Sequence, residues 1–580
     1  MTGMLQYLKG YRKECVIAPL FKMLEASFDL LVPLVMAQII NTGIASHDLR
    51  FIFVRCGILL LLAFIGLACS LTAQYFAAKA SVGYAAAVRT ALFSHIEKLG
   101  FSELDTIGTS TLITRMTSDL NQVQSGMNLF LRLFLRSPFV VFGAMLMAFR
   151  VDPKSAVIFV CTIPLLAAAV FGVMAVTRPL YRSVQQKVDR VLGLTRENLD
   201  GVRVIRAFGR EADETLRFDR SNNELTSLQL LAGRLSALMS PVTYVIINTA
   251  IALLLYSGAL QIRSGALAQG DVIALVNYMN QILVELVKLA NLIVQVSKAL
   301  ACAGRVGTVL ASEPSMKYPE TLPPAASPER AGEAVRFDHV SLTYAGAGAP
   351  SLQDISFTAL RGETIGVIGG TGSGKTSLVH LIPRFYDATE GTVSVFGIPA
   401  ADYPRDMLRE HISVVMQRAQ LFSGTIRSNL LWGNAGASDE ELLSALRTAQ
   451  AEEFVLSKPL GLDEPVEQDG RNFSGGQKQR LTIARALVHK PDILILDDSA
   501  SALDLATDAA LRRALKQLDP NTTVFIVSQR TASISRADRI LVLDEGCLVG
   551  NGTHESLLSS CPVYREIYES QFRKEGSIHG

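Results

Sequence analysis

GVIGGTGSGKTSL, residues 366–378, begins with an apolar run typical of a buried β-strand and leads into a helical stretch. Glycines in such a turn let backbone N–H groups surround the phosphates of a nucleotide. Lys375 can then reach the β- and γ-phosphates, and Thr376 can bind magnesium. The predicted P-loop consists of Gly369, Gly370, Thr371, Gly372, Ser373, Gly374, Lys375, Thr376 and Ser377. By itself this motif indicates only that the chain binds a nucleoside triphosphate.

The P-loop lies in a C-terminal half with short β-rich runs. TIGVIGG, ISVVMQ, DILILDD and TTVFIVS alternate there with helical stretches. This alternation predicts a soluble α/β domain over residues 332–580. The preceding residues, 312–331, are rich in Pro, Ser and Glu, and we expect them to form a linker.

Long apolar runs occupy the first 300 residues. Residues 155–177 contain no charged residue over 23 positions, enough for a helix to cross a hydrocarbon core about 30 Å thick. Five comparable runs raise the number of predicted spans to six: 16–45, 51–78, 134–150, 155–177, 241–262 and 272–300. We therefore expect an α-helical membrane domain over residues 1–311. Residues 4–14 are expected either to lie on the membrane surface as a short helix or to lead into the first span.

The connections between the spans predict the orientation in the membrane. The connection 178–220 holds ten Lys or Arg residues, whereas 45–50, 151–155 and 261–271 hold one each. Because cationic loops stay on the cytoplasmic side, the long connections and both termini are expected in the cytoplasm of a cell whose plasma membrane holds the chain. Apolar residues at three- and four-residue spacing predict that the long connections, 79–133 and 178–240, are helical.

Composition narrows the function further. The chain is 49% hydrophobic and its net charge is only +2, which gives no reason to expect a nucleic-acid partner. The seven cysteines show no CxxC spacing, so neither a zinc site nor a disulfide framework is expected. No signal peptide and no internal repeat is evident in the sequence.

Two further motifs follow the P-loop. NFSGGQKQRLTIARAL, residues 472–487, places Ser-Gly-Gly at the start of a helix, where backbone N–H groups can bind an anion. LILDDSASALD, residues 494–504, is an apolar strand that ends in Asp497 and Asp498. P-loop, SGGQ and acidic strand in this order resemble an ATP-binding cassette. TSTLITRMTSDLNQVQ (109–124) and ENLDGVRVIRAFGRE (197–211) resemble the two intracellular loops of exporter-type ABC proteins.

The resemblance implies a half-transporter: six membrane helices of the exporter-type ABC fold, fused to one α/β P-loop domain that binds ATP and magnesium. It implies that Tyr344 stacks on adenine and that Asp497, Gln417 and Thr376 bind magnesium. It also implies that a signature sequence, Ser474, Gly475, Gly476 and Gln477, with Phe473 where Leu is usual, binds the ATP held by a second cassette. The loop from Ser501 to Asp504 resembles the one that crosses to that partner. Segments near 109–119 and 198–210 would transmit cassette closure to the membrane helices.

Two positions depart from the family pattern. Asp498 stands where the family has the glutamate that polarises the attacking water, and Gln529 stands where it has a histidine on the γ-phosphate. The loop 466–470, VEQDG, also differs from the family's usual form. Both altered residues would serve the chain's own ATP, whereas the intact signature would serve the partner's. The pattern is similar to the degenerate-site subunit of bacterial heterodimeric multidrug exporters, so we expect ATP-driven export of amphipathic small molecules by a heterodimer with a different half-transporter.

Several alternatives remain open at this level. The chain can be a homodimeric lipid or peptide exporter that tolerates Asp498, an exporter-fold importer of metal chelates, or a regulator that transports nothing. The substrate is not evident either. A polar strip in the last span and Asp29 in the first can face a transport cavity, or Glu285 and Lys288 can form an ion pair within one helix. The strip consists of Asn277, Asn280, Gln281, Glu285, Lys288, Asn291 and Gln295.

Overall fold

The computed structural model describes Met4, residues 6–322 and residues 332–572. The chain forms two compact units, one of Met1–Glu97 with Ser110–Ser312, the other of Lys98–Thr109 with Glu313–Gly580. The predicted linker has no helix or strand over 312–322, and its remainder, 323–331, lies outside the described residues. The tail beyond 572 also lies outside them.

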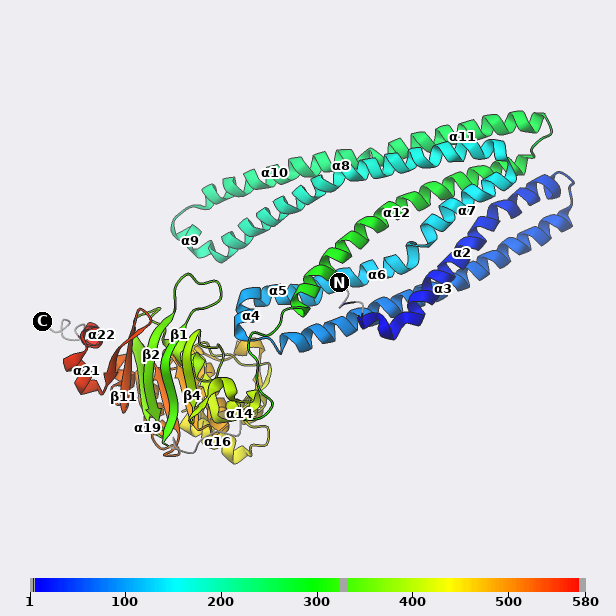
Figure 1. The fold of residues 1–580 in the computed structure, drawn as a ribbon. Coiled ribbons are helices and arrows are strands. Elements are labelled where there is room, and N and C mark those ends of the chain that lie inside the picture. Colours follow the sequence, from blue (N-terminus) through cyan, green and yellow to red (C-terminus); the bar gives the residue numbers. More distant parts are fainter. Residues whose placement is uncertain (1–3, 5, 323–331, 573–580) are drawn as a thin grey trace. The chain divides into compact units, whose positions relative to one another are not determined.

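The first unit is helical throughout, and six of its helical stretches are long and apolar enough to span a membrane, as the sequence predicted. They run over Gln6–Ile44, Leu49–Ile96, Thr109–Val151, Pro153–Asp200, Glu211–Arg263 and Gln269–Leu310. A stretch of 48 residues extends about 72 Å at 1.5 Å per residue, more than twice the hydrocarbon core. The prediction that the long connections continue as helices is thus confirmed (Figure 1).

Several of these stretches contain more than one element. The first combines a 3-10 helix and a π-helix with α2, and the third contains a π-helix and a break after Leu133. The elements are η1 (Gln6–Tyr11), α2 (Arg12–Gln38), η2 (Ile39–Ile44), α3 (Leu49–Ile96), α5 (Thr109–Thr114), η3 (Arg115–Asp119), α6 (Leu120–Leu133), α7 (Arg136–Val151), α8 (Pro153–Asp200), α9 (Val202–Ala207), α10 (Glu211–Ala237), α11 (Met239–Arg263) and α12 (Gln269–Leu310).

Aspartates cap the helices that begin after two of the short connections. Asp48 accepts a hydrogen bond from the backbone N–H of Phe51 at 3.1 Å, and Asp152 accepts one from Ser155 N at 2.9 Å. Each carboxylate satisfies an N–H group that a helix start leaves without an intrahelical partner. These caps explain why α3 and α8 begin where they do.

Small residues allow the membrane helices to approach closely. A Cβ atom on Gly126 of α6 would lie 2.2 Å from the Cβ of Ala299 on α12, and one on Gly143 of α7 would lie 2.4 Å from Leu30 Cδ1 on α2. Interfaces between membrane helices depend on such close packing, because lipid tails are as apolar as the side chains. The helices α2, α6, α7 and α12 are therefore held together as one bundle.

The second unit contains the expected α/β domain. A four-stranded antiparallel sheet has the order β2-β1-β4-β5, and a six-stranded sheet has the order β12-β11-β3-β10-β9-β6, in which all neighbours except β11 and β12 are parallel. The strands of these sheets are β1 (Glu333–Leu342), β2 (Leu352–Leu360), β3 (Thr364–Gly369), β4 (Glu390–Val395), β5 (Ile398–Pro399), β6 (Ile412–Val415), β9 (Ile493–Asp497), β10 (Thr523–Val527), β11 (Arg539–Asp544) and β12 (Cys547–Gly552). A short ribbon pairs β7 (Gly424–Thr425) with β8 (Pro465–Val466).

Helices surround the sheets of this unit (Figure 1). They are α13 (Lys375–Leu381), α14 (Arg405–His411), α15 (Ile426–Leu430), α16 (Asp439–Thr448), α17 (Glu452–Leu456), α18 (Gly475–Val488), α19 (Leu505–Leu515), α20 (Thr531–Ile534), α21 (His554–Ser560) and α22 (Pro562–Phe572), with short 3-10 turns η5 (Ala400–Asp402), η6 (Gly461–Asp463) and η7 (Gln468–Gly470).

One helix from the first long connection belongs to this second unit. In α4 (Phe101–Ile107) the ring of Phe101 packs on Phe385 with centroids 4.6 Å apart, and Asp105 Oδ2 accepts a hydrogen bond from Tyr386 Oη at 2.6 Å. The part of the connection that groups with the cassette is Lys98–Thr109. The sequence pattern missed it because an aromatic contact between distant residues leaves no periodic signal. Transmission of closure by residues 109–119 stays a prediction.

Candidate functional site

Four loops meet at one edge of the six-stranded sheet. The parallel strands β3, β6, β9 and β10 all end there, and each continues into a predicted motif. Ligands of open α/β sheets bind at the carboxyl ends of parallel strands. The fold thus brings together residues that are far apart in the sequence.

The P-loop is the turn from β3 to α13. Gly372 and Gly374 have φ angles of +83° and +93°, which side chains with a Cβ rarely adopt. A Cβ on Gly374 would also lie only 2.6 Å from the carbonyl oxygen of Ser351. Glycine is therefore required at this position by both backbone conformation and space.

Lys375 lies buried in the curve of this loop. Its ammonium donates hydrogen bonds to the carbonyl oxygens of Gly369 at 3.0 Å and Gly370 at 2.5 Å. Burial lowers the pKa of Lys375, and the charges of Asp498 and Asp497 oppose that shift. A phosphate group would replace the carbonyl partners with a stronger, charge-assisted one.

A cavity of about 340 Å³ adjoins the P-loop. It is lined by eight of the residues that the motifs predicted for nucleotide binding, by Asp498 and Gln529, and by Ser351 and Val527. The lining consists of Ser351, Thr371, Gly372, Gly374, Lys375, Thr376, Ser377, Gln417, Asp497, Asp498, Val527 and Gln529. The arrangement provides cationic and backbone donors for phosphate beside two carboxylates.

Oxygen ligands for magnesium lie on the wall of this cavity. Thr376 Oγ1 donates to Asp497 Oδ1 at 3.1 Å, and Asp497 is 1% exposed. Thr376, Gln417 and Asp497 also line a neighbouring cavity of about 360 Å³. Hydroxyl, amide and carboxylate oxygens suit magnesium, which usually keeps water and phosphate among its ligands. These three residues fit a magnesium ion bound with a nucleotide, where it would neutralise phosphate charge.

His380 is a further residue at this site, and the motifs did not predict it. It lies on α13, and its Nε2 is 3.6 Å from Asp497 Oδ2. That nitrogen is buried and has no hydrogen-bond partner among the described residues. A protonated ring would place a cation beside the predicted magnesium carboxylate. Its position one and a half turns after Lys375 is the only sequence signal.

Asp498 has an unusual backbone. Its φ is +44°, and its N–H donates to the carbonyl oxygen of Val527 on the neighbouring strand at 3.1 Å. Aspartate adopts positive φ more readily than most side chains do, because its short polar group can bond locally. Burial and the adjacent Asp497 charge raise the pKa of Asp498, and the amide of Gln417 opposes this shift by donating to Oδ2 at 3.3 Å.

The loop that carries Gln529 is fixed by the last helix. Gln571 of α22 donates from Nε2 to the Gln529 carbonyl oxygen at 2.7 Å. Its Oε1 accepts hydrogen bonds from the N–H and the hydroxyl of Thr531, both at 2.9 Å. No sequence signal indicates these hydrogen bonds, because a lone glutamine in an amphipathic helix resembles any solvated position.

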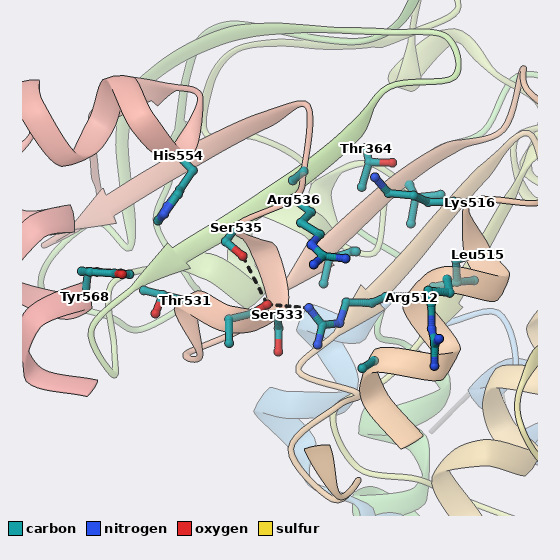
Figure 2. Close-up of a pocket in the computed structure, with 16 residues that line it drawn as sticks. Thr364, Arg512, Leu515, Lys516, Thr531, Ser533, Ser535, Arg536, His554 and Tyr568 are labelled. Atoms are coloured by element: carbon teal, nitrogen blue, oxygen red, sulfur yellow. Dashed lines mark hydrogen bonds between the residues drawn. The ribbon is translucent and has the colours of Figure 1, made fainter. Parts of the chain in front are cut away.

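A larger cavity of about 540 Å³ lies on the other side of this loop. Figure 2 shows Arg512 pointing toward α20, where it donates to the backbone carbonyl of Ala532. The basic side chains around the cavity are Arg512, Arg513, Lys516, Arg536 and His554, and no carboxylate is among the lining residues. Thr531 lines this cavity while Gln529 lines the P-loop cavity, so the loop contributes to both walls.

Tyr344 does not line the P-loop cavity. Its hydroxyl donates to Ser377 Oγ at 2.9 Å, and its ring meets Tyr386 edge to face with centroids 5.0 Å apart. Burial raises the pKa of Tyr344. Stacking on adenine remains a prediction for this residue.

The signature is folded as a helix start, away from the chain's own P-loop cavity. Ser474 caps α18: its hydroxyl accepts from Gln477 N at 3.3 Å, and Gln477 Oε1 accepts from Ser474 N at 3.0 Å. Phe473 is 5% exposed and packs in the core, which a leucine would also do. None of the four signature residues is among those that line the P-loop cavity.

The neighbouring loops are likewise well defined. Ser501 Oγ donates to the carbonyl oxygen of Asp498 at 2.8 Å, and Asp504 caps α19 through Thr507 N at 2.8 Å. In the atypical loop 466–470, Asp469 and Gly470 have φ angles of +57° and +61°. Nothing in the structure explains why this loop departs from the family form.

Comparisons with known proteins agree with these features. The family model of the ABC transporter transmembrane region matches residues 15–286, and that of the ABC transporter matches residues 352–501. The ABC transporter ATP-binding protein YfiB of Bacillus subtilis is 37% identical over 577 residues, covering 100% of both chains. The ATP-dependent lipid A-core flippase of Chromobacterium violaceum is 30% identical and covers 98% of this chain and 97% of its own.

Two further comparisons cover most of the chain. The fatty acid ABC transporter ATP-binding/permease protein of Mycobacterium bovis is 32% identical, covering 83% of this chain and 75% of its own. The structure of a bacterial Atm1-family ABC exporter with ATP bound has a TM-score of 0.78 at 21% identity and covers 97% of this chain and 98% of its own. The chain therefore belongs to the ABC transporters, as an exporter whose transmembrane domain is fused ahead of one ATP-binding cassette.

Proposed function

We propose that this exporter moves amphipathic small molecules across the cell membrane as one half of a heterodimer. In this proposal its own P-loop site binds ATP but hydrolyses it slowly, and its signature completes the competent site of a different half-transporter. ATP closes the two cassettes, and hydrolysis at the partner's site reopens them. Alternating access then follows from the higher affinity of ATP for the closed state.

One observation carries this proposal. The two residues that depart from the family pattern, Asp498 and Gln529, both line the P-loop cavity, whereas the signature does not. Aspartate is about 1.5 Å shorter than glutamate, and a misplacement of about 1 Å can reduce a rate on the order of a hundredfold. A neutral amide also cannot supply the positive charge that a histidine can provide. Both changes therefore weaken one site and spare the other.

A homodimeric lipid exporter is the second candidate. It is favoured by the relatives that are named for the transport of lipid A-core and of fatty acid. Both relatives are named for the movement of amphiphiles, so the two candidates share a substrate class. They differ in whether one chain supplies both halves of a working ATP site.

Two substitutions distinguish the candidates. A Cβ on Gly475 would meet nothing within 4 Å, so Gly475→Asp adds a negative charge at the signature without a clash in this chain. Gly475→Ala is the matched control for size. In the heterodimer, Gly475→Asp should reduce ATP turnover at least a hundredfold more than Asp498→Asn does, because only the former acts on the competent site.

The measurement is steady-state ATP hydrolysis by the purified chain in lipid, alone and co-expressed with the second half-transporter. Near-zero turnover alone, strong turnover together and unequal losses support the heterodimer. Brisk turnover alone, with comparable losses from both substitutions, would establish the homodimer instead.

A further inference from the structure

Four charged side chains from three helices meet inside the membrane domain. Arg136, the first residue of α7, donates to Glu285 Oε1 on α12 at 2.5 Å and to Asp29 Oδ2 on α2 at 2.9 Å. Lys288 donates to the same Oε1 at 2.9 Å, and Ser137 Oγ donates to Oε2 at 2.8 Å. The four-charge cluster of Asp29, Arg136, Glu285 and Lys288 is neutral overall.

The cluster lies at membrane depth. Asp29, Arg136 and Glu285 are each about 15 residues from the end of their helical stretch at a short connection. At 1.5 Å per residue this is about 22 Å, which is less than the roughly 30 Å thickness of the hydrocarbon core. Ionisable residues at such depth are costly and usually belong to a functional site.

A broken helix coincides with the cluster. The third membrane stretch is interrupted between Leu133 and Arg136, so α7 starts beside these charges. Helix starts expose N–H groups that lack intrahelical partners, and transporters use broken helices to line binding sites. Arg136 Nε and Gln281 Oε1 are also buried without a hydrogen-bond partner among the described residues. These two atoms of the cluster are therefore able to form further hydrogen bonds.

The four charges divide into an inner and an outer pair. The side chains of Glu285 and Arg136 are 4% and 12% exposed, whereas those of Asp29 and Lys288 are 46% and 43% exposed. The inner pair is fixed by its mutual contacts. The outer pair leaves nearly half of one acidic and one basic side chain exposed, while each keeps one partner in the cluster.

The exposed face beside Lys288 carries polar side chains next to apolar ones such as Val284, which is 50% exposed. Along α12 it carries the predicted polar strip, whose members Asn277, Asn280, Gln281, Asn291 and Gln295 are all partly or fully exposed. Lipid tails cannot hydrogen-bond to such a surface. The polar members of this face can bind water or a polar ligand, and the alternative of a self-contained Glu285–Lys288 pair does not account for Asp29 and Arg136.

We propose that Asp29 and Lys288 form a headgroup subsite for a zwitterionic amphiphile. The cationic group of the substrate binds Asp29, and its anionic group binds Lys288. A purely anionic headgroup would meet repulsion from Asp29, and a purely cationic one would meet repulsion from Lys288. This inference rests on the proposed export of amphipathic molecules and specifies the charge of the molecule that this chain accepts.

Equilibrium binding tests the subsite without nucleotide or transport. The purified full chain in a nonionic maltoside detergent is titrated with three labelled single-chain amphiphiles: lysophosphatidylethanolamine, lysophosphatidylglycerol and an alkylamine of equal chain length. The wild-type chain should bind the zwitterion about tenfold more tightly than either charged probe, as expected for one charge-assisted hydrogen bond. Asp29→Asn should abolish the preference over the anion, and Lys288→Gln the preference over the cation.

Matched controls are available elsewhere in the helical unit. Lys79 on α3 is 49% exposed and pairs with Glu14 at 3.0 Å, and Asp213 on α10 is 58% exposed and pairs with Arg210 at 2.5 Å. Lys79→Gln and Asp213→Asn should leave the order of the three affinities unchanged. Equal effects of Asp29→Asn and Lys288→Gln on all three probes, or no effect, would overturn the subsite. A loss of dimers on Lys288→Gln would overturn it too, because it would assign Lys288 to a subunit contact.

The result is separable from the proposed function. If the chain proves not to export, the order of affinities can still be measured and still decides the subsite. If export is retained while the order of affinities is lost, the subsite is wrong and the proposed function stands.

Discussion

The side-chain amide of Gln417 contacts the carboxylate that ends the predicted catalytic strand: Nε2 lies 3.3 Å from Asp498 Oδ2. The two residues follow β6 and β9, which are parallel neighbours in the six-stranded sheet. In the proposed mechanism Gln417 binds magnesium and Asp498 polarises water, so this contact connects the two roles.

Lengthening that carboxylate should activate the site. We expect Asp498→Glu combined with Gln529→His to increase ATP turnover of the purified chain on the order of a hundredfold. The glutamate extends the carboxylate toward the attacking water, and the histidine can carry a positive charge next to the γ-phosphate. Glutamate at a φ of +44° should cost about 1 kcal/mol of stability. Steady-state hydrolysis in lipid measures the gain, and Lys375→Ala in the same background should abolish it. Unchanged turnover would show that the length of the carboxylate side chain does not limit ATP hydrolysis at this site.

Gln571 should act on nucleotide turnover from the last helix. Its three hydrogen bonds fix the loop with Gln529 and Thr531. Gln571→Ala should therefore raise the KM for ATP and lower kcat, while Gln571→Glu, which keeps the acceptor and loses the donor, should have an intermediate effect. Ser570→Ala, at an exposed position of the same helix, is the control. Kinetics identical to wild type in both Gln571 variants would show that the loop holds its position unaided.

The sequence predicted the architecture well because its signals are local. Six apolar stretches and the P-loop are each contiguous, so periodicity and composition reveal them. Contacts between distant residues are a different matter: neither Arg136 beside Glu285 nor Gln571 beside Gln529 leaves a pattern in the sequence. In the sequence, Arg136 stands at the start of an apolar run and resembles a charge that flanks a membrane span. Only the packing of the helices shows that it contacts Glu285. The same limit explains why the contact between Phe101 and Phe385 was not predicted.

Removing Phe101 should uncouple the two domains' activities. Its ring packs on Phe385, and Asp105 of the same helix accepts a hydrogen bond from the Tyr386 hydroxyl. Burial and Asp105 raise the pKa of Tyr386, so its hydroxyl remains a donor at neutral pH. We expect Phe101→Ala to reduce ATP-dependent transport into inside-out vesicles at least tenfold while nucleotide binding is retained. Ser102→Ala is the control, and a parallel loss of nucleotide binding would contradict a role in coupling.

Stability should depend on pH through Asp498. Its raised pKa means that the folded chain binds the proton more tightly than the unfolded chain, so ionised Asp498 opposes folding at neutral pH. Asp498→Asn should therefore raise the thermal unfolding temperature of the cassette near pH 7. The gain should shrink as pH falls through the raised pKa and vanish near the unfolded value of about 3.9. Thermal unfolding from pH 7 to pH 4 tests this, and a gain that grows on acidification would contradict it.

The inner pair of the four-charge cluster should be structural rather than ligand-binding. Arg136→Met leaves Glu285, whose side chain is 4% exposed, without its main partner. Breaking a buried pair costs about 3–5 kcal/mol, whereas replacing both partners by apolar residues of similar size is often neutral. Arg136→Met should therefore lower the unfolding temperature in detergent, and Arg136→Met with Glu285→Leu should restore most of the loss. Lys288→Gln, at the exposed end, should have little effect on the unfolding temperature. If the double variant were less stable than Arg136→Met alone, Glu285 would hold the helices through Ser137 and Lys288 rather than through Arg136.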